Sequence, residues 1–117
     1  MMLGRLFLCL GAVLLLCTAL VHSTGGAMVS GWLEGQRQAV LSLAWYLLAI
    51  DWVAVGLVWL YCAWRADRRL VPIGWLAAII PAAAGIGLII AVGPGFFGIW
   101  MLLGATLFAG IGLLRLR

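Results

Sequence analysis

The chain contains 117 residues, of which 68% are hydrophobic and 9% are charged. This composition excludes an ordinary water-soluble domain, and the length suits a single domain over residues 1–117. The formal net charge of +4 comes from seven arginines with no lysine. Because the arginines flank apolar stretches, they indicate orientation in a lipid bilayer and contact with anionic headgroups, and we expect no nucleic-acid partner.

The first apolar stretch predicts a membrane-spanning helix over residues 3–22. Its positive start at Arg5, its apolar core and the small residue Ser23 also resemble a cleavable signal peptide, but we expect the segment to be retained as a span. Gly4 and Gly11 leave room for another helix to approach this one closely.

Residues 23–38 form the one sizeable polar loop, and their four glycines predict flexibility. A short helix carrying Met28 and Trp32 on one face would lie flat on the outer membrane surface.

The polar side chains of this outer face are His22, Glu34 and Arg37. A histidine near a carboxylate can act as an acid or a base, or can bind a metal. Equally, the three residues can mark only a polar helix end at the headgroups. His22 is the only histidine, so one chain offers neither two haem ligands nor a histidine-rich metal site, and no cofactor is assigned.

The stretch over residues 39–64 predicts the second span. A helix of this length, at about 1.5 Å per residue, crosses a hydrocarbon core of about 30 Å with some tilt. Trp45, Trp52 and Trp59 recur every seven residues along one stripe. This stripe is either a surface for packing and anchoring, or a stacking surface for a cofactor or a flat lipid.

Asp51 is the one carboxylate of that span and lies near its middle. A charge at the bilayer centre is costly, so we expect Asp51 to face the bundle, to be paired or to be protonated. Two roles stay open: a proton or cation site, or a neutral acid that joins helices by hydrogen bonds.

The third and fourth spans, over residues 70–92 and 96–114, are joined by Gly93-Pro94-Gly95, which predicts a tight turn and an antiparallel hairpin. Pro81, near the centre of the third span, lacks an N–H and tends to kink a helix. Ala105 and Ala109 form a small-xxx-small pair suited to close helix packing.

Asp51, Thr106 and Pro81 fall at similar depths in such a bundle. Thr106 lies near the middle of its span, and Pro81 frees a backbone carbonyl near mid-membrane. We therefore expect Asp51 to meet Thr106, the third helix near Pro81, or both.

The charge distribution predicts the orientation of an all-α, integral membrane four-helix bundle. Four spans place both termini and the basic loop at residues 65–69 on one side. That side holds Arg5, Arg65, Arg68, Arg69, Arg115 and Arg117, whereas Arg37 stands alone on the other. The excess favours an arrangement with both termini inside, and the all-arginine set indicates the inner (plasma) membrane of a bacterium.

Motifs with a known chemistry are not found in the sequence, which has no nucleotide loop, zinc-protease signature, nucleophile elbow or CxxC pair. We expect Cys9, Cys17 and Cys62 to behave as small buried apolar residues.

Several features resemble the small four-helix bacterial membrane proteins grouped as DoxX-like. They are Gly4-Arg5 before an apolar run, His22 at the end of the first helix, Trp45 early in the second, Pro72-Ile73-Gly74-Trp75 after a basic loop, and the GPGFFGIW of residues 93–100. The resemblance implies an architecture and no catalytic residue. Small multidrug transporters also have four helices, but their acid lies in the first helix, where this chain has none.

The function expected from these features is that of a non-enzymatic membrane subunit or interaction protein, packing against helices of other subunits or of itself. The alternative is a homo-oligomeric transporter or ligand-binding protein with Asp51 as its proton or cation site. A third interpretation is a membrane enzyme that uses His22 and Glu34 at the outer surface.

Overall fold

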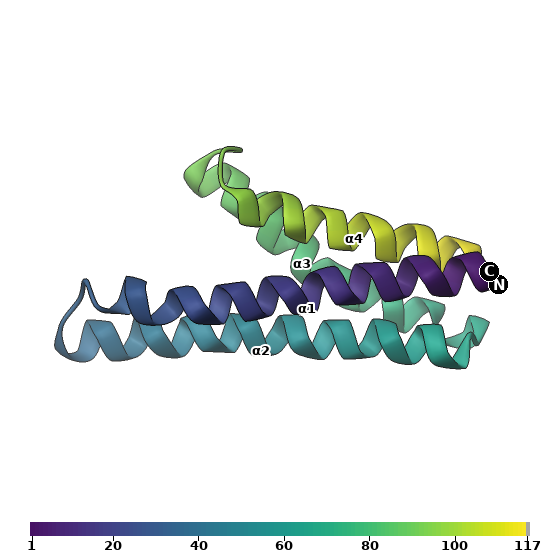
Figure 1. Cartoon of the computed structure of the whole chain (residues 1–117), viewed down its shortest axis with the longest axis horizontal. Coiled ribbons are helices and arrows are strands. Elements are labelled where there is room, and N and C mark those ends of the chain that lie inside the picture. The colour runs from purple at the N-terminus through teal and green to yellow at the C-terminus, as the bar shows by residue number, and fades with distance from the viewer. Residues whose placement is uncertain (117) are drawn as a thin grey trace.

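A computed structural model describes residues 1–116, without the side chains of Ala27 and Ser30; Arg117, assigned to the basic side, lies outside the described residues. The architecture is all-α, as predicted, and each of four helices is long and apolar enough to span a membrane (Figure 1). The helices are α1 (Met2–Ser30), α2 (Gly35–Arg65), α3 (Val71–Val92) and α4 (Phe97–Arg115), with a 3₁₀ turn, η1 (Arg68–Leu70), before α3.

The separate interfacial helix expected within residues 23–38 does not form, because α1 continues to Ser30 and α2 begins at Gly35. The hydroxyls of Ser23 and Thr24 donate to backbone carbonyls of the preceding turn, so these polar residues are satisfied inside the helix. Packing of this turn against α2 offsets the poor helix propensity of its glycines. The prediction of a flexible loop over residues 23–38 was wrong for residues 23–30, because local helix propensity does not include packing against another helix.

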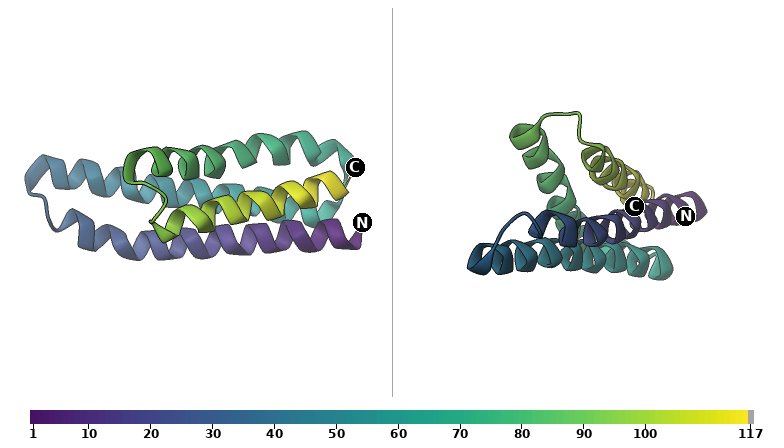
Figure 2. Two further views of the ribbon diagram at one scale, coloured as in Figure 1. Left: turned by 90° about the horizontal axis from the view of Figure 1, so that it is seen from above. Right: turned by 60° about the vertical axis from the view of Figure 1, so that its left-hand side comes forward.

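The helix α1 is the central element of the bundle. It packs along both α2 and α4, while α3 packs on α4 and, less extensively, on α2, so α2 and α4 occupy diagonal positions. Both termini lie at the same end (Figure 1). At about 1.5 Å per residue, α1 and α2 exceed the thickness of a ~30 Å hydrocarbon core, and their connection extends beyond that of α3 and α4 (Figure 2).

The backbones of α1 and α4 touch where both helices carry small residues. A Cβ atom added to Gly11 would lie 2.8 Å from the Ala105 carbonyl oxygen and 2.8 Å from the Ala109 nitrogen. One added to Gly112 would lie 2.7 Å from the backbone nitrogen of Leu8. The predicted close approach at Gly11 and the Ala105/Ala109 pair is therefore confirmed.

The contact of α2 with α3 is anchored near the basic end. Trp59 is fully buried, and its Nε1–H donates to the carbonyl of Gly74 over 3.2 Å. The opposite ends of the helical pairs diverge: α3 and α4 lean away from α1 and α2 toward their own connection (Figures 1 and 2). That connection contains Gly93 at a φ of 81°, followed by Pro94, whose carbonyl accepts from the Trp100 indole.

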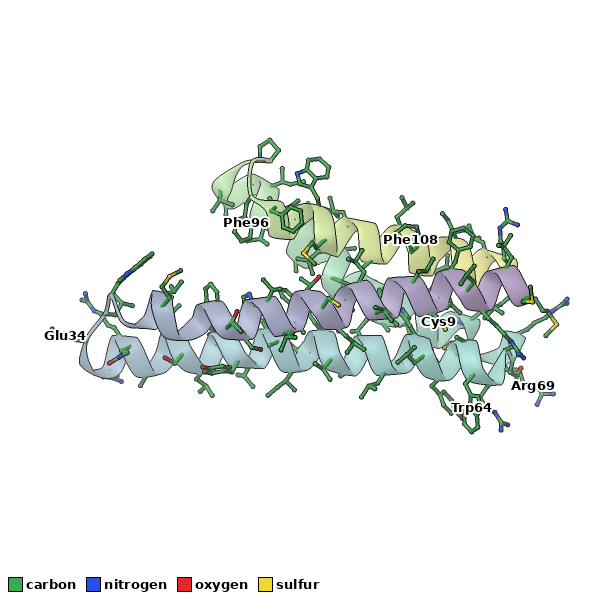
Figure 3. All side chains as sticks on the ribbon, viewed as in Figure 1. Cys9, Glu34, Trp64, Arg69, Phe96 and Phe108 are labelled. Atoms are coloured by element: carbon green, nitrogen blue, oxygen red, sulfur yellow. The ribbon has the colours of Figure 1, made fainter. Side chains whose placement is uncertain are left out.

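The two ends of the molecule also differ in charge. Figure 3 shows Trp64 and Arg69 at one end and Glu34 at the tip of the α1–α2 connection. Asp67 caps the 3₁₀ turn at the basic end by accepting from the backbone N–H of Arg69.

We expect Gly11→Ala to destabilise the protein by about 1–3 kcal/mol, because the added methyl meets backbone atoms that cannot swing aside. Gly87→Ala is the matched control, since a Cβ atom there meets nothing within 4 Å. It should leave stability unchanged or raise it by up to about 1 kcal/mol through helix propensity. Unfolding in mixed detergent micelles measures both changes, and equal effects of the two variants would contradict the assigned helix contact.

Candidate functional site

A cavity lies where the α1–α2 pair and the α3–α4 pair diverge. Its volume is about 740 Å³. We call it the wedge, and its lining residues are His22 from α1, Trp45, Leu48 and Trp52 from α2, Ala84, Gly87, Leu88 and Val92 from α3, and Gly95 and Phe96 from the α3–α4 connection. Figure 3 shows Phe96 at that connection, away from the basic end. The wedge is almost entirely apolar.

The imidazole of His22 is held by two indoles. It stacks on Trp45 with ring centroids 4.2 Å apart and planes 3° from parallel. Trp52 meets it edge to face at 4.8 Å and 61°. The Trp45 Nε1–H also donates to the backbone carbonyl of His22. Each aromatic pair contributes about 0.5–1.5 kcal/mol beyond its burial, so the three rings form one ordered aromatic cluster.

Two glycines of α1 leave the space that the Trp45 indole occupies. A Cβ atom on Gly26 would lie 2.7 Å from Trp45 Cδ1, whereas one on Gly25 would make an ordinary 3.6 Å contact with Trp45 Cζ2. His22 and Gly26 are four residues apart and therefore share one face of the helix. These glycines were expected to lie in a flexible loop, and the spacing of Gly25 and Gly26 from His22, three and four residues, was the available signal for a helix face.

Two of the residues that line the wedge carry a ring nitrogen without a hydrogen bond. His22 Nε2 and Trp52 Nε1 are buried and have no hydrogen-bond partner among the described residues. The Trp52 side chain is only 3% exposed. Leaving a buried donor or acceptor unpaired costs about 1–3 kcal/mol. A functional role is one physical reason for a protein to retain such a group.

Asp51 lies outside the wedge, although Leu48 and Trp52 on either side of it in the sequence line that cavity. Its side chain is exposed on the surface of α2. Thr106 is on the diagonally placed α4, where its hydroxyl donates to the Leu102 carbonyl of its own helix over 2.9 Å. Pro81 is buried within an uninterrupted α3. The structure therefore does not bring Asp51 and Thr106 together.

The outer-face residues are also not brought into one site. Glu34 is exposed at the tip of the connection, precedes α2 and makes no capping hydrogen bond with its side chain. Arg37 lines a different hollow of about 410 Å³ on α2, together with Val40 and Leu41. His22 belongs instead to the aromatic cluster, about two turns before the end of α1 at Ser30.

The tryptophan stripe divides into two parts. Trp45 and Trp52 line the wedge, whereas Trp59 is a fully buried packing residue that donates to α3. The sequence pattern is the same for all three residues. The difference arises because α3 contacts α2 near Trp59 and stands away from it near Trp45.

Within residues 1–116, no cluster of three or more His, Cys, Asp and Glu side chains could hold a metal ion. Cys9, Cys17 and Cys62 are free thiols in partly buried, exposed and buried positions respectively, so only Cys62 is fully buried as expected.

Comparison of the chain with models of protein families, with curated proteins and with solved structures finds no match. The chemistry of the wedge and of Asp51 therefore rests on the residues themselves.

We expect Gly26→Ala to displace the Trp45 indole and to weaken its hydrogen bond to the His22 carbonyl, because the new methyl meets the rigid ring. The indole N–H resonance of Trp45, assigned by a Trp45→Phe variant, should shift upfield as the hydrogen bond lengthens. Gly25→Ala is the matched control and should leave that resonance in place. A Trp45 signal unchanged in Gly26→Ala would show that the ring does not lie on this glycine.

Proposed function

We propose that the chain is a non-enzymatic membrane subunit or interaction protein, and that the surface of α2 around Asp51 packs against a transmembrane helix of a partner. The exposed position of Asp51 carries this proposal. Neither the aromatic cluster nor the exposed Glu34 supports the enzyme interpretation, since His22 and Glu34 belong to separate parts of the outer half.

Asp51 is deep within its span. It is 14 residues from Arg65 at the basic end of α2, or about 21 Å at a rise of ~1.5 Å per residue. Insertion scales place the cost of a carboxylate at mid-bilayer near 2.5–3.5 kcal/mol. A partner helix that donates a hydrogen bond to Asp51 removes much of that cost.

The residues around Asp51 suit a helix–helix contact. Leu47, one turn before it, is 50% exposed, and Ala54, three residues after it, is also exposed. A polar group flanked by a small residue and an apolar one is the arrangement by which helices associate in lipid, where apolar surface alone gives no preference. The partner helix would carry Ser, Thr, Asn, Gln or a basic residue at the same depth.

The resemblance to DoxX-like proteins supports the same small multi-pass architecture. Together with the arginine distribution, it supports placement in a bacterial inner membrane with both termini inside.

The test is native mass spectrometry of the protein extracted gently from its own membrane. We expect a complex that contains at least one other membrane protein, and Asp51→Leu should reduce its recovery about fivefold or more, because an interhelical hydrogen bond in lipid is worth about 1–2 kcal/mol. Leu57→Ala, at an exposed position elsewhere on α2, should leave recovery unchanged. Purification of the wild type as a stable, partner-free monomer would overturn the proposal.

A complex made only of copies of this chain would favour the alternative function. Asp51 would then lie at an interface between copies, as the proton or cation site of a small transporter. Proton-coupled uptake into vesicles, compared between the wild type and Asp51→Asn, measures that activity directly.

A further inference from the structure

We propose that the wedge binds a planar, apolar ring molecule that carries a carbonyl-type hydrogen-bond acceptor. The site is distinct from the Asp51 surface and requires no partner protein. Its volume of about 740 Å³ falls within the ~300–1,000 Å³ usual for small-molecule sites.

The two sides of the wedge favour a flat occupant. On one side, the rings of His22, Trp45 and Trp52 are already fixed by stacking and by the Trp45 hydrogen bond. On the other, Ala84 and Gly87 of α3 give a smooth surface, and a Cβ atom at Gly87 would meet nothing within 4 Å. An aromatic side facing a smooth one leaves a slot in which a ring stacks with little reorganisation.

The unpaired ring nitrogens set the chemistry of the occupant. Trp52 Nε1 can only donate, and His22 Nε2 either donates or accepts according to its tautomer. An acceptor oxygen on the ligand would satisfy the Trp52 N–H, with a small adjustment of the indole. The hydrocarbon tail of a lipid fills apolar space but offers no acceptor, and its ester carbonyl carries no ring that could stack on the indoles. A ring-bearing carbonyl compound is therefore favoured over a lipid chain.

The position of the wedge suits entry from the membrane interface. Its lining ends at Gly95 and Phe96 in the α3–α4 connection, where Phe97 and Trp100 are also exposed. Aromatic side chains concentrate at the headgroup level. A ring molecule dissolved in the bilayer can therefore reach the wedge without crossing water.

The test uses two probes of nearly equal size, 2-acetylnaphthalene and 2-ethylnaphthalene, which differ by a carbonyl oxygen. The protein in nanodiscs is dialysed against each probe, and retention is compared with protein-free nanodiscs of the same lipid. We expect saturable, stoichiometric retention of the ketone, at least about fivefold stronger than that of the hydrocarbon, because only the ketone accepts a buried hydrogen bond. Trp52→Phe should abolish the preference between the probes.

A second pair of variants locates the binding. Gly87→Leu places a side chain in the slot and should remove retention, while thermal unfolding shows that the protein remains folded. Ala39→Leu adds a leucine at an exposed position of α2 outside both the wedge and the Asp51 surface, and should leave retention of the ketone unchanged. Equal retention of both probes, no saturable retention of the ketone, or full retention in Gly87→Leu would each overturn the proposal. None of these outcomes depends on whether Asp51 has a partner.

Discussion

The backbone contact between α1 and α4 is the constraint on which the other packing depends. Gly11 allows the two helices to approach until backbone atoms meet at Ala105 and Ala109. In lipid, apolar surface gives no hydrophobic drive between helices, so close van der Waals packing of small residues replaces it. Since α1 also packs along most of α2, fixing α4 on α1 orients three of the four helices, and α3 is placed by its connections and by Trp59.

The wedge forms because the two ends of α2 are hydrogen-bonded to different helices. Trp59 ties α2 to the α3 backbone at Gly74, and Trp45 ties it to the α1 backbone at His22. Both are indole-to-carbonyl hydrogen bonds, but they engage different neighbours at different depths. The end of α2 near Trp45 is therefore joined to α1 alone, and α3 is free to lean away. Bulky rings on α2 and small residues on α3 then face each other without filling the space between them.

The sequence was sufficient for the spans, the turn at residues 93–95 and the small-residue contact at Gly11, because these depend on local hydrophobicity and on residue size. It was insufficient for residues 23–30. Serine and glycine there have weak helix propensity, which is offset by the packing of Gly26 against Trp45 of another helix. The candidate site could not be predicted for the same reason, because it depends on packing between helices. His22 and the tryptophans were identified singly, but their convergence depends on the extension of α1 past His22 and on the divergence of α3.

Asp51 and Trp52 show how one helix can serve two surfaces. Neighbouring residues on a helix differ by about 100° in direction, so the carboxylate emerges at the bundle surface while the indole is 3% exposed in the cluster. The expected contact of Asp51 with Thr106 assumed that equal depth implies proximity. Depth fixes only one coordinate, and the diagonal placement of α2 and α4 puts the two residues on different sides of α1. The bundle leaves the Asp51 carboxyl group exposed at this depth. Contact of that group with a polar partner is energetically favoured over contact with lipid alone.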